Sequence, residues 1–460
     1  MSIILPASRV ASLTEKERRE WEKRLTVTEQ RVFKKNRPDY TPRKQICTLH
    51  RHEDMFFLPF ARGIEMGYRD CRVPLEFAKG WGSFSVELRE EQKKIMEDSL
   101  QKLKAHGSLL LAVYPGGGKT ITTLRISRAL GYPVLIIVNR LVLMDQWKNS
   151  ILRCFGPSSG SMFQVVSAKK DLHPGRNFYI INAINVPKFD ERDWREHLGI
   201  GTVVVDECHL IMTKVFVQSL GCVAPRFLIG LSATPYRNDG MDELFETYFG
   251  ASKTCIYVPL HRNHIVYPFR TSFTYENEYS ADGRLLWNRI IDKQSFHPGR
   301  QALITRLCKE FSDRRILILG KRVEALRQIS GMIPGSAVFM GTQVVFDADA
   351  RVLVSTFSKV GTGFSHDCLD MLILANDTED YFLQYLGRVF RRPDVVPIVI
   401  DIIDNHPVLH NHYRTRSKVY KDTGGVLCDT PSHWAEWITG SSDRSATSRE
   451  DSPTLSGSDS

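Results

Sequence analysis

The sequence predicts an α/β protein of two tandem domains, each with a parallel β-sheet flanked by helices. Two blocks of alternating strand-like and helix-like segments, at 85–250 and 296–425, predict this fold. Their apolar runs are continuous rather than alternating, which is typical of parallel strands that are buried on both faces. The predicted strands are 109–113, 134–138, 178–181, 202–205 and 227–231 in the first block, and 315–319, 336–340, 351–354, 371–374 and 397–402 in the second.

Three further regions flank or separate the two blocks. Residues 1–84 lack the alternating rhythm and are predicted to form a small N-terminal accessory region that could contact nucleic acid, with a charged helix between Leu13 and Glu29. Residues 251–295 are predicted to be a connector with surface elements of its own. Residues 441–460 carry eight serines and almost no apolar side chain, so we expect this tail to be disordered.

The composition suits two or three domains of ordinary size, because the chain has 460 residues and 42% of them are hydrophobic. The 62 Lys and Arg outnumber the 52 Asp and Glu, and the net charge of +10 favours a polyanionic partner such as nucleic acid or an anionic membrane surface. No apolar run approaches the roughly 18 residues of a membrane span, and the N-terminus lacks the features of a secretory signal. We therefore expect an intracellular protein of the cytoplasm or nucleus, with no membrane partner.

The nine cysteines are scattered along the chain without a C-x-x-C pair. Buried free thiols are the expected state of such cysteines. Cys47, His50 and His52 lie close together, but no second pair of ligands stands near them, so the spacing disfavours a zinc site.

A glycine-rich turn between a predicted strand and a predicted helix carries the first chemical motif. At such a helix N-terminus, backbone N–H groups can surround a phosphate. The Lys119 ammonium can reach the outer phosphates of a nucleotide, and the Thr120 hydroxyl can bind Mg²⁺. The alternative is a flexible turn beside a chance lysine. The predicted ATP-binding residues of the turn are Pro115, Gly116, Gly117, Gly118, Lys119 and Thr120.

Two more motifs follow predicted buried strands, at the strand ends where open α/β sheets bind ligands. Asp206 and Glu207 follow one strand; Asp206 could hold Mg²⁺ and Glu207 could polarise an attacking water. Ser232 and Thr234 follow the next strand and could hydrogen-bond the acidic pair, which would couple the nucleotide state to the rest of the molecule. Alone, the acidic pair would also suit a solvated helix start, and the hydroxyl pair a helix cap. The order and spacing of the three motifs favour one shared site.

With these motifs the chain resembles superfamily 2 helicases of the DEAD/H kind, which implies two tandem RecA-like domains over roughly residues 85–425. Among them it looks closest to the xeroderma pigmentosum B type and to helicases of large DNA viruses, of poxvirus or iridovirus type. Val113 stands where the phosphate loop usually begins with glycine, a departure that this superfamily tolerates. A viral member would act in the host cell or the virion.

The resemblance implies further site residues. An upstream L-R-x-x-Q element makes Gln92 the candidate that reads the adenine edge. The segment 384–391 looks like motif VI, Q-x-x-G-R-x-x-R, in which Gln384 would couple the domains. Arg388 and Arg391, three apart on a helix, would point together across the interdomain cleft as arginine fingers. A basic helix face in solvent is the alternative.

The predicted nucleic-acid contacts are less specific. The segment from Val134 to Trp147 resembles motif Ia, which makes Arg140 a backbone-contact candidate. Another segment resembles motif V and offers Thr356, although the aspartate usual there is absent and Asp367 is the nearest substitute. A basic stretch before the first block offers Lys35 and Arg43 for phosphate contact, with a solvated surface as the alternative.

Together these features predict a nucleic-acid-dependent ATPase with ATP and Mg²⁺ as cofactors. We expect an ATP-dependent DNA helicase or double-strand DNA translocase in transcription, repair or replication, with DNA favoured over RNA and with transcription or repair machinery as further partners. An RNA helicase and an ATP-gated nucleic-acid clamp without processive unwinding are the alternatives. The intact Glu207, Arg388 and Arg391 argue against the clamp, because a clamp needs no fast hydrolysis.

Overall fold

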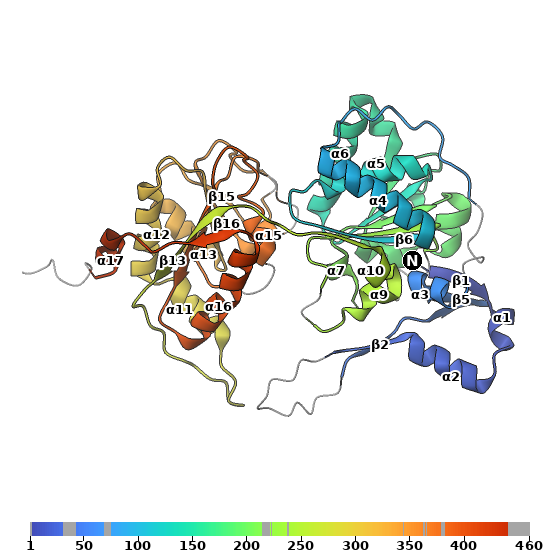
Figure 1. Cartoon of the computed structure of the whole chain (residues 1–460), viewed down its shortest axis with the longest axis horizontal. Coiled ribbons are helices and arrows are strands. Elements are labelled where there is room, and N and C mark those ends of the chain that lie inside the picture. Colours follow the sequence, from blue (N-terminus) through green and yellow to red (C-terminus); the bar gives the residue numbers. More distant parts are fainter. Residues whose placement is uncertain are drawn as a thin grey trace, which may run out of the picture. The chain divides into compact units, whose positions relative to one another are not determined.

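A computed structural model divides the chain into two compact units, Met1–Leu260 and His261–Ser460 (Figure 1). Each unit has its own seven-stranded sheet flanked by helices, which confirms the predicted fold class. The tail 441–460 lies outside the described residues, and so does Lys35. The described residues are 2–30, 43–68, 75–213, 221, 223–236, 239–343, 345–361, 364, 366–378 and 382–439.

The sheet of the first unit is parallel throughout, with the strand order β12-β6-β11-β10-β7-β9-β8. Its five central strands are the five predicted ones, because they are buried along almost their whole length. The edge strands β8 and β12 were not predicted: the side chains of both are partly exposed, and β12 lies in the segment that was assigned to the connector. The strands are β6 (Ser108–Val113), β7 (Val134–Val138), β8 (Phe163–Val166), β9 (Phe178–Asn182), β10 (Thr202–Val205), β11 (Phe227–Ser232) and β12 (Cys255–Val258).

Helices bury the two faces of this sheet in two hydrophobic cores. Two of the longer helices end at a glycine in the left-handed region, Gly107 (φ 78°) and Gly131 (φ 79°), which closes the last helical turn without a steric penalty. The main helices are α4 (Glu90–His106), α5 (Lys119–Leu130), α6 (Leu141–Phe155), α7 (Cys208–Ile211), α9 (Glu243–Phe249) and α10 (Ala251–Thr254).

The N-terminal region is built onto the first sheet and shares its core. Ile3 and Phe60 belong to the same buried cluster as Leu110 of β6 and Tyr248 of α9. This region has two small antiparallel sheets, β1-β5-β4 and β2-β3. Its elements are β1 (Ser2–Pro6), α1 (Ala7–Ala11), α2 (Glu15–Arg24), β2 (Thr26–Thr28), β3 (Gln45–Cys47), β4 (His50–His52), β5 (Met55–Pro59) and α3 (Phe60–Glu65).

The sheet of the second unit is also parallel, with the order β15-β16-β14-β17-β18-β13-β19. The five predicted strands are present and lie side by side. The strands are β13 (His264–Arg270), β14 (Ile316–Gly320), β15 (Ala337–Phe339), β16 (Val352–Thr356), β17 (Met371–Leu374), β18 (Ile398–Ile403) and β19 (Gly425–Leu427). The helices are α11 (Trp287–Ser295), α12 (Pro298–Glu310), α13 (Val323–Gly331), α14 (Phe357–Gly361), α15 (Phe382–Leu386), α16 (Pro407–Asp422) and α17 (Ser432–Thr439).

The segment 251–295, predicted as a connector, contains elements of both units. It holds α10 and β12 of the first unit and β13 and α11 of the second. The strand β13 includes Pro268, and β19 pairs only with its first three residues, so the proline lies where one side of the strand has no β-ladder. Within the described residues, no helix combines the length and the apolar character that crossing a membrane requires.

Candidate functional site

The glycine-rich turn joins β6 to α5 at the carboxyl edge of the first sheet. Gly116 and Gly118 adopt positive φ angles of 86° and 84°, which few other residues tolerate. At Gly117 a Cβ atom would lie 2.5 Å from Val113 Cγ1, so a side chain does not fit there either. The Lys119 ammonium folds back over the turn and donates to the Val113 carbonyl at 2.8 Å. The turn therefore forms a tight backbone cradle with a lysine above it, as phosphate binding requires.

Gln92 lies against this cradle. It stands in the first turn of α4, and its Oε1 accepts a hydrogen bond from the Arg89 backbone N–H at 2.9 Å. A Cβ at Gly118 would lie 1.9 Å from Gln92 Nε2, so the amide packs directly on the glycine. The predicted adenine residue is thus buried, with 6% of its surface exposed, beside the loop predicted to hold the phosphates.

The acidic pair follows β10 at the same edge of the sheet. Asp206 is 8% exposed, and its two oxygens accept hydrogen bonds from the Trp147 indole N–H and the Glu207 backbone N–H, both at 2.9 Å. Burial and the neighbouring Glu207 carboxylate raise the pKa of Asp206 to about 6, against the lowering effect of Trp147 and Lys119. Glu207 has a φ of 46°, a strained conformation for a residue with a side chain and one that occurs often at functional sites.

The predicted coupling residues contact the acidic loop through a histidine. Ser232 Oγ lies 3.0 Å from His209 Nδ1, and His209 Nδ1 lies 3.6 Å from Glu207 Oε2. Ser232 Oγ also accepts from the Thr234 backbone N–H. The Thr234 hydroxyl is buried without a hydrogen-bond partner among the described residues. The sequence suggested that the hydroxyls bond the acidic pair itself; in the structure Ser232 meets the loop at His209.

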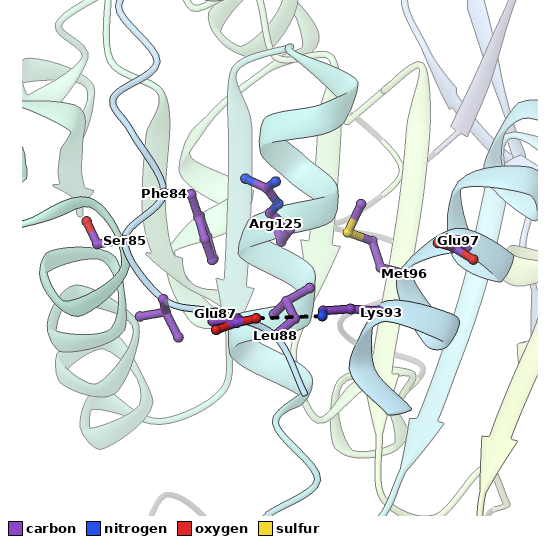
Figure 2. A pocket seen from close by; sticks show the side chains of 9 residues that line it. Phe84, Ser85, Glu87, Leu88, Lys93, Met96, Glu97 and Arg125 are labelled. Atoms are coloured by element: carbon purple, nitrogen blue, oxygen red, sulfur yellow. Dashed lines mark ion pairs between the residues drawn. The ribbon is translucent and has the colours of Figure 1, made fainter. Parts of the chain in front are cut away.

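A pocket of about 420 Å³ opens between the segment before α4, the helix α4 and the helix α5 (Figure 2). The Arg125 guanidinium lies 5.1 Å from the centre of the Phe84 ring, and Glu87 pairs with Lys93 at 3.7 Å (Figure 2). Sequence reasoning missed this pocket, because its residues come from three elements. It is lined by Phe84, Ser85, Val86, Glu87, Leu88, Lys93, Met96, Glu97 and Arg125.

In the second unit, the two predicted arginine fingers lie close together, but not for the predicted reason. The helix α15 ends at Leu386, and the next three residues form a turn, so Arg388 and Arg391 do not share a helix face. Instead both guanidinium groups donate to the Phe364 carbonyl. Helical periodicity was therefore the wrong basis for their proximity.

Further contacts hold these arginines against the end of α14 and the residues that follow it. Arg388 donates to the Gly361 carbonyl at 3.0 Å, and Arg391 pairs with Asp367 at 2.8 Å. Gln384 is buried, and its Nε2 has no hydrogen-bond partner among the described residues. Thr356 ends β16, and its hydroxyl lies 3.3 Å from Ser358 Oγ. The two motif VI arginines thus contact the end of the motif V segment, at Gly361 and Phe364.

Of the candidates for nucleic-acid contact, Arg43 and Arg140 lie on the surface of the first unit, whereas Thr356 lies in the second unit and is buried, with 8% of its surface exposed. Arg140 is exposed at the start of α6, directly before Leu141, whose side chain is 71% exposed. Arg43 is also exposed. In the described part of the chain, no group of three or more His, Cys, Asp or Glu could hold a metal ion, and this includes the region of Cys47 and His50.

A parallel sheet with a phosphate cradle and an acidic pair at its carboxyl edge is the architecture of a P-loop nucleoside-triphosphatase. A second domain of the same kind, with a Q-x-x-G-R-x-x-R segment, makes this class of protein a helicase motor.

Comparisons with known proteins agree with this class. Residues 85–237 match the family model of the type III restriction enzyme, res subunit. The chain is 37% identical over 372 residues to "Putative helicase 161L" of Invertebrate iridescent virus 6, which covers 75% of this chain and 83% of that protein. It is 31% identical over 398 residues to "Putative helicase 055L" of Frog virus 3 (isolate Goorha), with coverage of 84% and 90%. The chain belongs to the superfamily 2 helicases, in the family of these iridovirus proteins.

The structure of S. cerevisiae Dbp5 bound to RNA and ADP BeF3 shares the fold. It matches with a TM-score of 0.51 and 13% identity, over 75% of this chain and 91% of that chain. This likeness supports a fold of two RecA-like domains. The family model and the iridovirus relatives make the chain a helicase-type, nucleic-acid-dependent ATPase.

Proposed function

We propose that this helicase uses ATP and Mg²⁺ to move along DNA, either as a strand-separating helicase or as a double-strand translocase. The observation that carries the ATPase part is the buried Asp206 carboxylate, which follows β10 at the same carboxyl edge of the sheet where Lys119 lies over the glycine cradle. A buried carboxylate and a lysine over a glycine cradle form the pair of groups that a magnesium nucleotide needs.

The residues of the site fit a magnesium ion that arrives with a nucleotide. Asp206 and Thr120 offer hard oxygen ligands, and Mg²⁺ usually takes one or two protein carboxylates together with phosphate oxygens. When bound, Mg²⁺ neutralises charge that develops on the transferring phosphoryl group. Lys119 would hold the outer phosphates and Glu207 would orient the attacking water. Arg388 and Arg391 would stabilise the transition-state charge during the hydrolytic cycle.

We further propose that the pocket between α4 and α5 takes the adenine base and ribose. Its volume of about 420 Å³ accommodates a nucleoside. The Phe84 ring and the Arg125 guanidinium both offer a flat face for stacking. Gln92 is not among the lining residues of this pocket, but its amide packs on Gly118 of the glycine cradle, which supports a role beside the bound nucleotide. A Phe84→Ala enzyme should show a higher KM for ATP and nearly the same kcat, whereas an unchanged KM would reject this placement.

DNA is the proposed substrate for two reasons. The family model that matches residues 85–237 is named for a restriction enzyme subunit, and the segment S-A-T-P-x-R-x-D-G looks closer to DNA-directed relatives than to RNA-directed ones. We propose that the protein acts inside the host cell, with transcription or repair machinery as further partners. An RNA helicase remains the second candidate, favoured by the fold shared with an RNA-bound protein.

The decisive experiment compares the ATPase rate with single-stranded DNA, double-stranded DNA and RNA, together with a triplex-displacement assay. We expect stimulation by DNA and displacement of the third strand. Lys119→Ala and Glu207→Gln should abolish the stimulated rate while the thermal unfolding midpoint stays nearly unchanged. Undiminished turnover in either variant would reject the assigned site, and stimulation by RNA alone would favour the second candidate. Binding that depends on ATP, without displacement or unwinding, would instead identify an ATP-gated clamp.

A further inference from the structure

The β7–α6 segment holds Asp206 at two points. The Asp206 backbone N–H donates to the Ile137 carbonyl of β7 at 2.9 Å. Its side-chain Oδ2 accepts from the Trp147 indole N–H of α6, also at 2.9 Å. The Trp147 side chain is 1% exposed, so solvent does not compete for this contact. A single supersecondary unit therefore sets both the main chain and the carboxylate of Asp206.

The junction of β7 and α6, which lies between these two contacts, is the exposed part of this β7–α6 segment. Arg140 directly precedes α6, and Leu141 and Val142 in its first turn leave 71% and 39% of their surfaces exposed. Trp147 follows Leu141 by six residues, which places it about 9 Å farther along the helix axis. A helix is stiff over this distance, so a force on its exposed end reaches the indole.

We propose that Trp147 is a positioning residue that couples strand binding at the start of α6 to the orientation of the Asp206 carboxylate. The proposal rests on the proposed function, because it assumes that nucleic acid contacts Arg140 and that Asp206 meets the magnesium nucleotide. The hydrogen bond from the indole N–H to Oδ2 fixes the rotation of the Asp206 carboxylate, so its remaining lone pairs point in a defined direction. When a nucleic-acid strand binds at Arg140 and Leu141, α6 shifts together with the Trp147 indole. Through its hydrogen bond, the indole then aligns the Asp206 carboxylate.

The competing explanation is that Trp147 only fills the core. The two explanations differ in the N–H group, because a phenylalanine keeps a buried aromatic ring and removes only the donor. The first compact unit, Met1–Leu260, contains another tryptophan that serves as a matched control. Trp194 is equally buried, at 1% exposure, and its indole N–H has no hydrogen-bond partner among the described residues. Trp194→Phe therefore measures the effect of replacing a buried indole whose N–H does not orient another side chain among the described residues.

The experiment compares Trp147→Phe and Trp194→Phe in the full-length protein. Removing a group that orients a metal ligand typically weakens metal affinity or activity about 10- to 100-fold. We expect Trp147→Phe to raise the Mg²⁺ concentration for half-maximal ATPase by about that factor and to reduce stimulation by DNA to a similar extent. Trp194→Phe should change both quantities less than about twofold.

A binding measurement provides a readout that does not depend on turnover. Coupling between two sites is reciprocal, so Mg·ADP should change the affinity for a DNA oligonucleotide in the wild type. Trp147→Phe should lose this change and keep the affinity that is measured without nucleotide. Should Trp147→Phe fold poorly, benzothienylalanine at position 147 keeps the indole shape and replaces the N–H by sulfur.

The outcomes separate the inference from the function on which it rests. If the wild type shows DNA stimulation and Trp147→Phe matches Trp194→Phe in Mg²⁺ dependence and in coupling, only the inference is overturned. If the wild type shows no stimulation by any nucleic acid, the proposed function and the inference both fall.

Discussion

His209 Nδ1 lies 3.0 Å from Ser232 Oγ, and this contact joins the acidic loop after β10 to the end of β11. The same ring nitrogen lies 3.6 Å from the Glu207 carboxylate. Ser232 Oγ donates to the Thr234 carbonyl at 2.6 Å, so it also holds the chain beyond β11. A change at Glu207 during hydrolysis therefore has a short, buried route to the segment after β11.

Ser232→Ala should separate ATP hydrolysis from movement. The variant removes the hydroxyl that connects His209 to Thr234, and it leaves Lys119 and Asp206 intact. We expect the ATPase rate to stay within a few-fold of the wild type while triplex displacement is lost. Ser99→Ala is the control, because Ser99 is a buried serine whose hydroxyl, among the described residues, bonds only the Ile95 carbonyl of its own helix. Normal displacement by Ser232→Ala would exclude this route.

Arg391→Ala should abolish hydrolysis and preserve ATP binding. Arginine fingers contribute about 10³- to 10⁵-fold to the rate where they have been measured. Asp367→Asn is the matched control, since it removes the ion pair with Arg391 and leaves the guanidinium in place. We expect a kcat near the wild-type value for Asp367→Asn and a loss of at least about a thousandfold for Arg391→Ala. If Arg391→Ala instead loses ATP binding, this arginine contacts ATP already in the ground state, before hydrolysis.

Mg²⁺ affinity should depend on pH through Asp206. Its pKa of about 6 lies above the ordinary value of 3.8, so protons compete with the metal in mildly acidic solution. We expect Mg·ADP affinity to fall about tenfold per pH unit below about pH 6. The free energy of unfolding changes in the opposite direction. Between pH 3.8 and about 6 the folded carboxyl keeps its proton and the unfolded one loses it, so its contribution to stability is lost as the pH rises over this range.

Glu207→Gln provides the control for this pH dependence. The Glu207 carboxylate is the second cause of the raised pKa of Asp206, after burial. Its neutral replacement should move the midpoint of the Mg·ADP affinity profile to lower pH. Calorimetric titration between pH 5 and pH 8 measures both proteins without turnover. An identical midpoint in the two proteins would show that another group controls the profile.

The variant Arg43→Ala tests whether the basic N-terminal region contacts DNA, without deletion of the region. Deleting residues 1–84 would expose Leu110 and other residues of the shared core, so a truncated protein is expected to unfold or aggregate. Arg43→Ala leaves the core intact and should reduce the salt slope of DNA binding by about one. Lys170→Ala, another exposed cation of the first unit, should leave the slope unchanged. Equal salt slopes for the two variants would show that Arg43 does not contact DNA.

The central strands and the phosphate turn could be predicted from the sequence because each depends on a pattern of residues that are adjacent in the chain. Each buried parallel strand requires a continuous apolar run, and a cradle of backbone N–H groups requires glycine at Gly116, Gly117 and Gly118. Edge strands such as β8 and β12 were not readable, since one side of an edge strand is free and its side chains are partly exposed.

The sequence by itself determined two α/β blocks, the order of the motifs and the chemical groups that each motif brings. Only the tertiary structure decided which of these groups meet. The contact of Trp147 with Asp206 spans 59 residues, and Arg388 meets Arg391 at the Phe364 carbonyl rather than on a helix. Such contacts depend on how sheets and helices pack, and neither periodicity nor spacing along the chain encodes that packing in a local pattern.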